Sequence, residues 1–198
     1  AVSLCDGEWA MRRILVLAAL LTGLAGCQGP TPGSDEASGN ILTIYGEIGT
    51  VDRGPVDPVT EPLFGAFGME FEAASLFNWT SLNAIEQHSI ASDFPAGGPV
   101  RRFSGPLLRD VIDIADPRGD TLVVTALDGY QREISLARIV DHDVILALRM
   151  DGQPLGVGGY GPAMLVWPRG SDPALDGMPD DDWLWGVFAV EVVAAAAD

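Results

Sequence analysis

Residues 104–115 read Ser104-Gly105-Pro106-Leu107-Leu108-Arg109-Asp110-Val111-Ile112-Asp113-Ile114-Ala115, and they contain the clearest helix signal in the chain. Proline suits the first turn of a helix, where its missing N–H costs no hydrogen bond. The apolar residues that follow recur at three- and four-residue spacing. They are Leu107, Leu108, Val111, Ile112 and Ala115. This pattern predicts a helix over residues 106–115 with one buried face.

Two hairpins are predicted on the C-terminal side of this helix. Residues 121–127 and 130–134 flank Asp128-Gly129, a dipeptide typical of tight two-residue turns. Asp151-Gly152 separates residues 143–150 from residues 153–155 in the same way. Two further strands are expected, at residues 163–167 and at about residues 183–193.

On the N-terminal side, residues 41–45 are β-branched and apolar and predict a first strand. Aromatic and sulfur side chains then cluster, and we interpret them as core. They are Phe64, Phe67, Met69, Phe71 and Phe77. A short helix is expected near Thr80, capped by Thr80 or Ser81. Strands with short helices between them favour a mixed α+β class, a mixed sheet with hairpins, over a doubly wound parallel sheet.

The N-terminal region has the order of a lipoprotein signal peptide. Two arginines follow Met11, residues 14–21 are entirely apolar, and Leu24-Ala25-Gly26-Cys27 resembles a lipobox. The apolar run is shorter than the roughly 18 residues that a membrane-spanning helix needs. We therefore expect Cys27 to be lipidated. Gln28 stands where an inner-membrane retention signal would resemble Asp, which favours the outer membrane, facing the periplasm.

These features predict four segments. Residues 1–10 precede the start methionine and are interpreted as an upstream extension that is not native. Residues 11–26 are the signal peptide, and residues 27–40 are a lipidated, flexible tether rich in Gly, Pro and Ser. Residues 41–198 form a single domain.

Composition excludes some classes of partner. The net charge is −17, so a nucleic-acid partner is not expected, because binding to phosphates needs basic groups. The acidity is interpreted as a solvated surface, with a docking face for a basic partner as the alternative. Cys5 and Cys27 are the only cysteines. Once Cys27 is acylated, the mature chain therefore has no disulfide and no thiolate metal ligand.

Four stretches of the domain carry a resemblance to a known family. They are residues 103–111, 126–130, 145–155 and 161–168. In order and spacing they resemble the molybdopterin-binding domain of the sulfite-oxidase family, in a short lipoprotein-like branch. The resemblance implies a mixed sheet with helices on its faces and a site for a pterin pyrophosphate that carries molybdenum.

The chain departs from the family at the positions that carry chemistry. The family has a molybdenum-ligating cysteine just upstream of the Phe-Ser-Gly motif, but residues 90–100 contain no cysteine. Met164 replaces a basic residue, and Asp182 replaces a lysine. We expect residues 180–182, three consecutive aspartates, to repel a pyrophosphate.

Five residues remain as candidates for binding a cofactor. The guanidinium groups of Arg101 and Arg102 suit phosphate, although neighbours on a strand point to opposite faces and at most one would line the site. A surface salt bridge is the alternative for both arginines. Tyr130, Gly161 and Pro162 lie in stretches that carry the resemblance.

The two histidines give a weaker signal. His88 and the run Asp141-His142-Asp143 could serve acid–base or metal chemistry. We favour a solvated loop for the run, because consecutive residues rarely converge on one ion. No catalytic residue and no metal ligand is assigned.

Two functions follow from this sequence. The first is a binding or accessory lipoprotein that uses the pterin cleft or its acidic surface to hold a small molecule or a protein, without molybdenum chemistry. The second is an active molybdopterin-dependent oxidoreductase whose metal is held without a protein thiolate. The sequence leaves the cofactor open.

Overall fold

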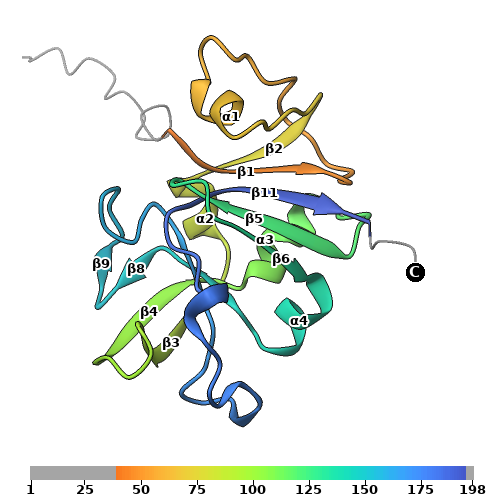
Figure 1. Ribbon diagram of the computed structural model, residues 1–198. Coiled ribbons are helices and arrows are strands. Elements are labelled where there is room, and N and C mark those ends of the chain that lie inside the picture. Colours follow the sequence, from red (N-terminus) through yellow and green to blue (C-terminus); the bar gives the residue numbers. More distant parts are fainter. Residues whose placement is uncertain (1–38, 195–198) are drawn as a thin grey trace, which may run out of the picture. The chain divides into compact units, whose positions relative to one another are not determined.

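The main sheet joins the first and last described strands of the domain. Figure 1 shows the computed structural model, which describes residues 39–194; the signal peptide and Cys27 lie outside that range. The strand order is β2-β1-β11-β5-β6, with β1 parallel to β11 and the other neighbours antiparallel. The bounds are β1 Asn40–Gly46, β2 Ala74–Asn78, β5 Thr121–Ala126, β6 Gln131–Ser135 and β11 Val187–Val193. The predicted first strand and the hairpin at Asp128-Gly129 are confirmed.

The other strands form a four-stranded and a two-stranded sheet. The four-stranded sheet has the order β3-β4-β8-β9, and β7 pairs with β10. The bounds are β3 Gln87–Asp93, β4 Val100–Pro106, β7 Ile145–Ala147, β8 Arg149–Met150, β9 Gln153–Pro154 and β10 Met164–Val166. The second predicted hairpin exists as β8 and β9. Its first strand, however, is divided at Leu148, whose N–H donates to the carbonyl of Ser104 at 2.8 Å.

The helix predicted at residues 106–115 is α3, which spans Leu108–Ile114. It begins later than predicted because Pro106 ends β4 and Leu107 is the N-cap. The other helices are α1 Pro62–Ala66, α2 Trp79–Ala84 and α4 Leu136–Asp141, with 3-10 turns η1 Pro173–Leu175 and η2 Asp180–Asp182. None of the helices within residues 39–194 is long and apolar enough to cross a membrane.

Two other local predictions need correction. Asn78 caps α2, not Thr80 or Ser81, since its side chain accepts a hydrogen bond from the N–H of Ser81 at 2.8 Å. The last strand begins at Val187 and not near residue 183. Trp183 and Leu184 are buried ahead of that strand.

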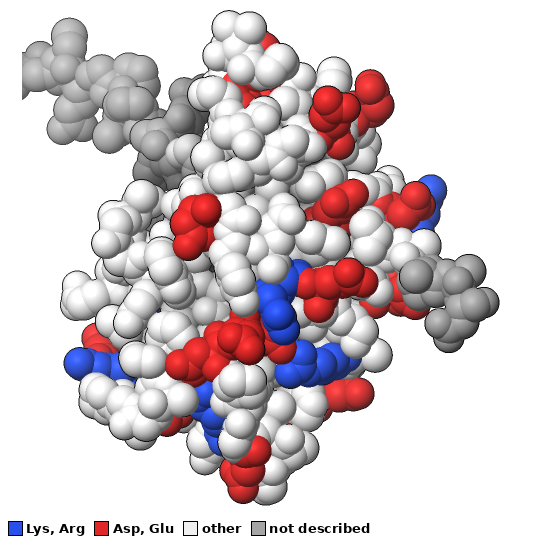
Figure 2. All heavy atoms as spheres, in the orientation of Figure 1, with Lys and Arg blue, Asp and Glu red and all other residues white. Residues whose placement is uncertain are grey.

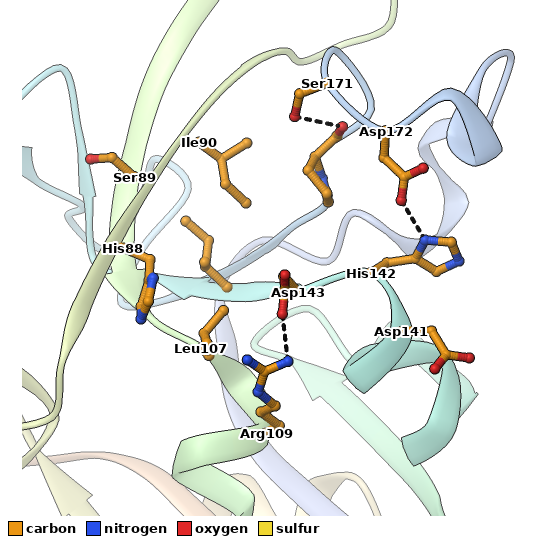
Figure 3. Close-up of a pocket in the computed structure, with 12 residues that line it drawn as sticks. His88, Ser89, Ile90, Leu107, Arg109, Asp141, His142, Asp143, Ser171 and Asp172 are labelled. Carbon is orange, nitrogen blue, oxygen red and sulfur yellow. Dashed lines mark hydrogen bonds and ion pairs between the residues drawn. The ribbon is translucent and has the colours of Figure 1, made fainter.

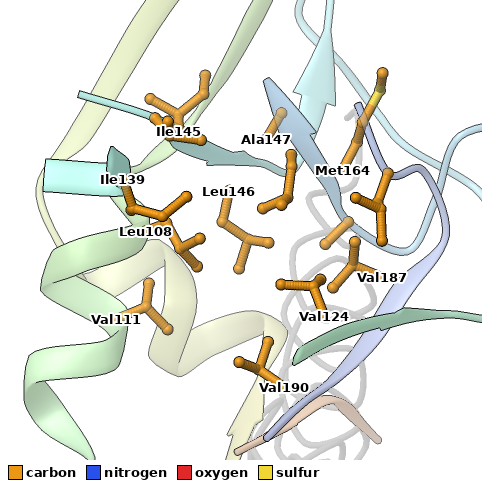
Figure 4. Close-up of a cluster of buried hydrophobic side chains, with 14 of the residues drawn as sticks. Leu108, Val111, Val124, Ile139, Ile145, Leu146, Ala147, Met164, Val187 and Val190 are labelled. Carbon is orange, nitrogen blue, oxygen red and sulfur yellow. The ribbon is translucent and has the colours of Figure 1, made fainter. Parts of the chain in front are cut away.

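The core lies on both faces of the main sheet. Leu108 and Val111 of α3 and Ile139 of α4 pack with side chains from β5, β7, β10 and β11 (Figure 4). An aromatic cluster forms separately around Tyr45, Phe64 and Phe71. Of the predicted aromatic core, Phe67 alone is only partly buried; Phe77 joins the larger cluster.

Truncating Leu108 or Ile112 to alanine should lower the free energy of unfolding by about 2–5 kcal/mol, because each side chain is fully buried and would leave a cavity. Ile114→Ala on the same helix is the matched control, since Ile114 is 49% exposed. That control should change stability by about 0.5 kcal/mol or less. Thermal and denaturant unfolding of the full chain measures both effects. Equal losses in Leu108→Ala and Ile114→Ala would contradict this buried face.

Candidate functional site

Three segments distant in sequence line one pocket of about 260 Å³. Phe94 follows β3, Tyr130 lies in the turn between β5 and β6, and residues 180–185 precede β11. We call this site the aromatic pocket. Its aromatic lining residues are Phe94, Tyr130, Trp183 and Trp185, and its acidic ones are Asp128, Asp180 and Asp181.

Tyr130 is fixed at the rim of this pocket by its neighbours. Its backbone N–H donates to Asp128 Oδ1 at 3.0 Å, and its hydroxyl donates to the carbonyl of Asp181 at 3.2 Å. The turn of the β5–β6 hairpin is thereby joined to the segment before β11. Of the five predicted binding residues, Tyr130 is the one that lines this pocket.

A buried arginine lies next to the aromatic pocket. The side chain of Arg169 is 8% exposed, and it forms ion pairs with Asp93 at 3.0 Å and Asp180 at 2.7 Å. It also donates to the carbonyls of Asp93 and Met178 and lies 4.7 Å from the ring centre of Trp183. We call these residues the Arg169 cluster. Hydrogen bonds from the N–H of Gly97 and from Arg169 hold the pKa of Asp93 below its ordinary value.

This cluster involves the stretch in which the resemblance implies a metal-binding cysteine. Asp93 ends β3 within residues 90–100, and Phe94 beside it stacks on Trp183 at 5.3 Å between ring centres. The segment is therefore fixed by an ion pair and an aromatic stack. Nearby, Ser92 is buried, and its hydroxyl has no hydrogen-bond partner within residues 39–194; it lines a separate open pocket with Arg169.

Two of the three consecutive aspartates at residues 180–182 form ion pairs with arginines. Asp182 is buried between two arginines, Arg132 at 2.7 Å and Arg138 at 2.5 Å. The hydrogen bond to Asp182 raises the pKa of Arg132. Asp180 is paired with Arg169, so within the described residues Asp181 alone of the three has no ion-pair partner. The repulsion of a pyrophosphate that we expected from three aspartates therefore comes from one unpaired carboxylate.

The other predicted binding residues lie elsewhere. Arg101 makes an ion pair with Asp151 at 3.0 Å with both side chains about half exposed, and Arg102 is exposed. Neither lines the aromatic pocket. Gly161 is a position of close backbone approach, since a Cβ there would lie 2.4 Å from the carbonyl oxygen of Leu155. Its bond to Pro162 is cis.

Both histidines line a different pocket of about 400 Å³ (Figure 3). His142 Nδ1 lies 2.6 Å from Asp172 Oδ2, and this hydrogen bond lowers the pKa of Asp172. Asp143 instead pairs with Arg109. The carboxylate of Asp141 points away from His142 and Asp143 (Figure 3). The run 141–143 therefore does not converge on one ion. Among the described residues no group of three or more His, Cys, Asp or Glu could hold a metal.

Sequence reasoning missed most of the aromatic pocket. Phe94, Trp185 and the Arg169 cluster were not singled out, because their partners are distant in sequence. Arg169 carried one usable signal, a charge two residues after the apolar strand at residues 163–167.

The family model for the oxidoreductase molybdopterin binding domain matches residues 72–170. The chain belongs to this family. A solved structure with the same fold is the sulfane dehydrogenase SoxCD from Paracoccus pantotrophus, with a TM-score of 0.52 and 16% sequence identity. The match covers 79% of this chain but 38% of that one, and at this identity it shows the fold alone. No curated protein matches the chain.

The residues at the aromatic pocket do not fit an anionic molybdenum pterin. Residues 39–194 contain no cysteine, so they offer no thiolate for the metal. A pyrophosphate needs free cationic groups, but the nearby Arg132, Arg138 and Arg169 are all paired with aspartates. The pocket itself presents carboxylates. Family membership therefore fixes the fold and not the ligand.

Replacing Arg169 with methionine should destabilise the domain by roughly 2–4 kcal/mol, because it leaves Asp93 and Asp180 without their cation. Arg101→Met is the control, and its exposed pair should contribute about 0–1 kcal/mol. Urea unfolding at neutral pH compares the two. Similar losses in both variants would contradict a structural role for the cluster.

Stability should also depend on pH through Asp93. Its folded-state pKa is below the unfolded value near 3.8, so its contribution is complete at neutral pH and is lost as the pH falls through the folded-state pKa. In Arg169→Met the acid decline of the melting temperature below pH 3.8 should be shallower than in wild type, because one cause of the lowered pKa is gone. Melting curves from pH 7 to pH 2.5 test this. Parallel declines in the two proteins would refute it.

Proposed function

We propose that this chain is a binding or accessory lipoprotein, built on the molybdopterin-binding fold but without molybdenum catalysis. The Arg169 cluster carries this proposal, because Asp93 and Asp180 supply the negative charge that the buried guanidinium needs. The domain thus satisfies this cation without an anionic cofactor. The family's activity does not follow from its fold, since activity depends on the residues of the site.

The proposed location is the outer membrane, facing the periplasm. The signal peptide and lipobox at residues 11–27 support a lipid anchor, which becomes stable when more than one acyl chain is attached. The acidic surface suits a soluble domain held beside a membrane: acidic side chains are spread over the face in Figure 2, where several basic ones lie next to them. A small molecule or a protein is the proposed partner, and nucleic acid is not.

Protein purified from a host that makes molybdopterin should contain far less than one molybdenum per chain and should not turn over sulfite or sulfoxides. The reason is the lack of a thiolate and of free cationic groups at the pocket. Elemental analysis and pterin fluorescence of the purified full chain provide the measurement. About one molybdenum per chain would instead support the alternative, an active molybdopterin-dependent oxidoreductase.

Substituting Cys27 should test the anchor. Cys27→Ala should leave the protein uncleaved or release it as a soluble periplasmic form, because the thiol that carries the lipid is removed. Cell fractionation with fatty-acid labelling follows both outcomes, and the wild-type chain is the control that should carry the label. Label and membrane association unchanged in Cys27→Ala would exclude lipidation at this residue.

A further inference from the structure

We propose that the aromatic pocket binds a small organic cation with a quaternary ammonium group, of the type found in choline. This inference rests on the proposed binding function and names the class of ligand. It is carried by two kinds of lining residue that occur together: two exposed aromatic rings, and two carboxylates that have no ion-pair partner among residues 39–194.

The aromatic rings provide the first part of the site. Tyr130 is 45% exposed and Trp185 is 42% exposed, although most large apolar side chains of the domain are buried. Both line the same pocket as the stacked pair Phe94 and Trp183. Aromatic faces attract cations through the ring quadrupole, and the attraction strengthens when water is excluded. A ligand in this pocket would cover rings that are otherwise left in water.

The charges provide the second part. Among the described residues that line the pocket there is no arginine or histidine, although Arg169 lies behind it against the ring of Trp183. Asp180 is neutralised by Arg169, but Asp128 and Asp181 have no ion-pair partner within the described part of the chain. Two carboxylates beside aromatic rings attract a cation and repel an anion. The charge of the ligand is therefore opposite to that of a pterin pyrophosphate.

The lining residues also favour a quaternary over a primary ammonium group. A primary ammonium is strongly hydrated and must exchange its water for hydrogen-bond acceptors, and among the lining side chains only the carboxylates are strong acceptors. A quaternary ammonium has no N–H groups, and aromatic surfaces are well suited to it. At about 260 Å³ the pocket is smaller than the roughly 300–1,000 Å³ of pockets that hold drug-sized ligands, so it suits a small molecule.

An unpartnered donor adds a further requirement. The indole N–H of Trp183, a residue that lines the pocket, is buried and has no hydrogen-bond partner in the part of the chain that the structure describes. A buried donor without an acceptor is unfavourable, and an oxygen atom on a ligand satisfies it only where a small movement of the lining uncovers the indole N–H. An alcohol oxygen meets this need without adding negative charge next to Asp128 and Asp181. Choline has this combination of groups.

The experiment titrates the purified full chain with choline chloride at constant ionic strength, followed by calorimetry and tryptophan fluorescence. Choline should bind saturably. Its neutral carbon isostere, 3,3-dimethylbutan-1-ol, should bind at least about tenfold more weakly, because it lacks the charge. Phosphocholine should also bind more weakly than choline, since the carboxylates repel its phosphate. Tighter binding of phosphocholine would overturn the proposal in favour of a lipid headgroup.

Paired variants separate the two parts of the site. Trp185→Leu should weaken choline binding about tenfold, whereas Trp185→Phe, which keeps an aromatic face, should weaken it about threefold or less. Asp181→Asn should weaken binding several-fold, while Asp113→Asn removes the same charge from an exposed position on α3 and should have no effect. Melting curves confirm that each variant is folded.

The outcomes distinguish this inference from the proposed function. Absence of saturable choline binding, or equal binding of the neutral isostere, overturns the quaternary ammonium proposal alone. Saturable binding of inorganic pyrophosphate that is lost in Tyr130→Ala would contradict the proposed function as well, because the pocket would then accept the anionic part of a pterin cofactor.

Discussion

Gly105 allows β4 and β7 to lie against each other with no side chain between them. A Cβ at this position would lie 2.0 Å from the carbonyl oxygen of Leu146, a distance that no other residue type could accommodate without moving the backbone. Hydrogen bonds on both sides of the glycine fix the contact, from Leu148 to Ser104 and from Leu108 to Val144. The start of α3 and the core strand β7 are thus positioned by one crossing. Because β3 pairs with β4 along its whole length, the same crossing also sets where Asp93 and Phe94 lie.

Backbone hydrogen bonds also fix the segment before β11, which lines the aromatic pocket. Leu184 accepts a hydrogen bond from Leu165, Gly186 accepts one from Leu127, and the N–H of Gly186 donates to Tyr160. These bonds connect the segment before β11 to β10 and to the β5–β6 hairpin. The place at which the three segments meet is therefore a property of the sheets, whereas its charge depends on side chains such as Asp128 and Asp181. Substitutions can reverse that charge without changing the fold.

The sequence predicted those parts of the fold that depend on neighbouring residues. Asp128-Gly129 and Asp151-Gly152 specify turns locally, and the buried face of α3 repeats along one helix. The division of a strand at Leu148 was not predictable, because β7 and β8 pair with different partners distant in sequence. β3 was missed since its sequence, Gln87-His88-Ser89-Ile90, has few apolar residues. Of the site, Tyr130 came from the family resemblance, and its neighbours Phe94 and Trp185 become visible in three dimensions.

The buried guanidinium of Arg169 connects the fold to the charge preference of the aromatic pocket. A buried cation needs an anion close by, and a bound phosphate or a protein carboxylate can fill that need. In this domain Asp93 and Asp180 fill it, and the partly exposed Arg132 and Arg138 both pair with the buried Asp182. Every arginine near the pocket is therefore satisfied by the protein itself, which removes the attraction for an anionic ligand. Among the described residues that line the pocket, Asp128 and Asp181 are the carboxylates without an ion-pair partner, so acids set its electrostatic preference. The aromatic rings around them determine which cations are stabilised there.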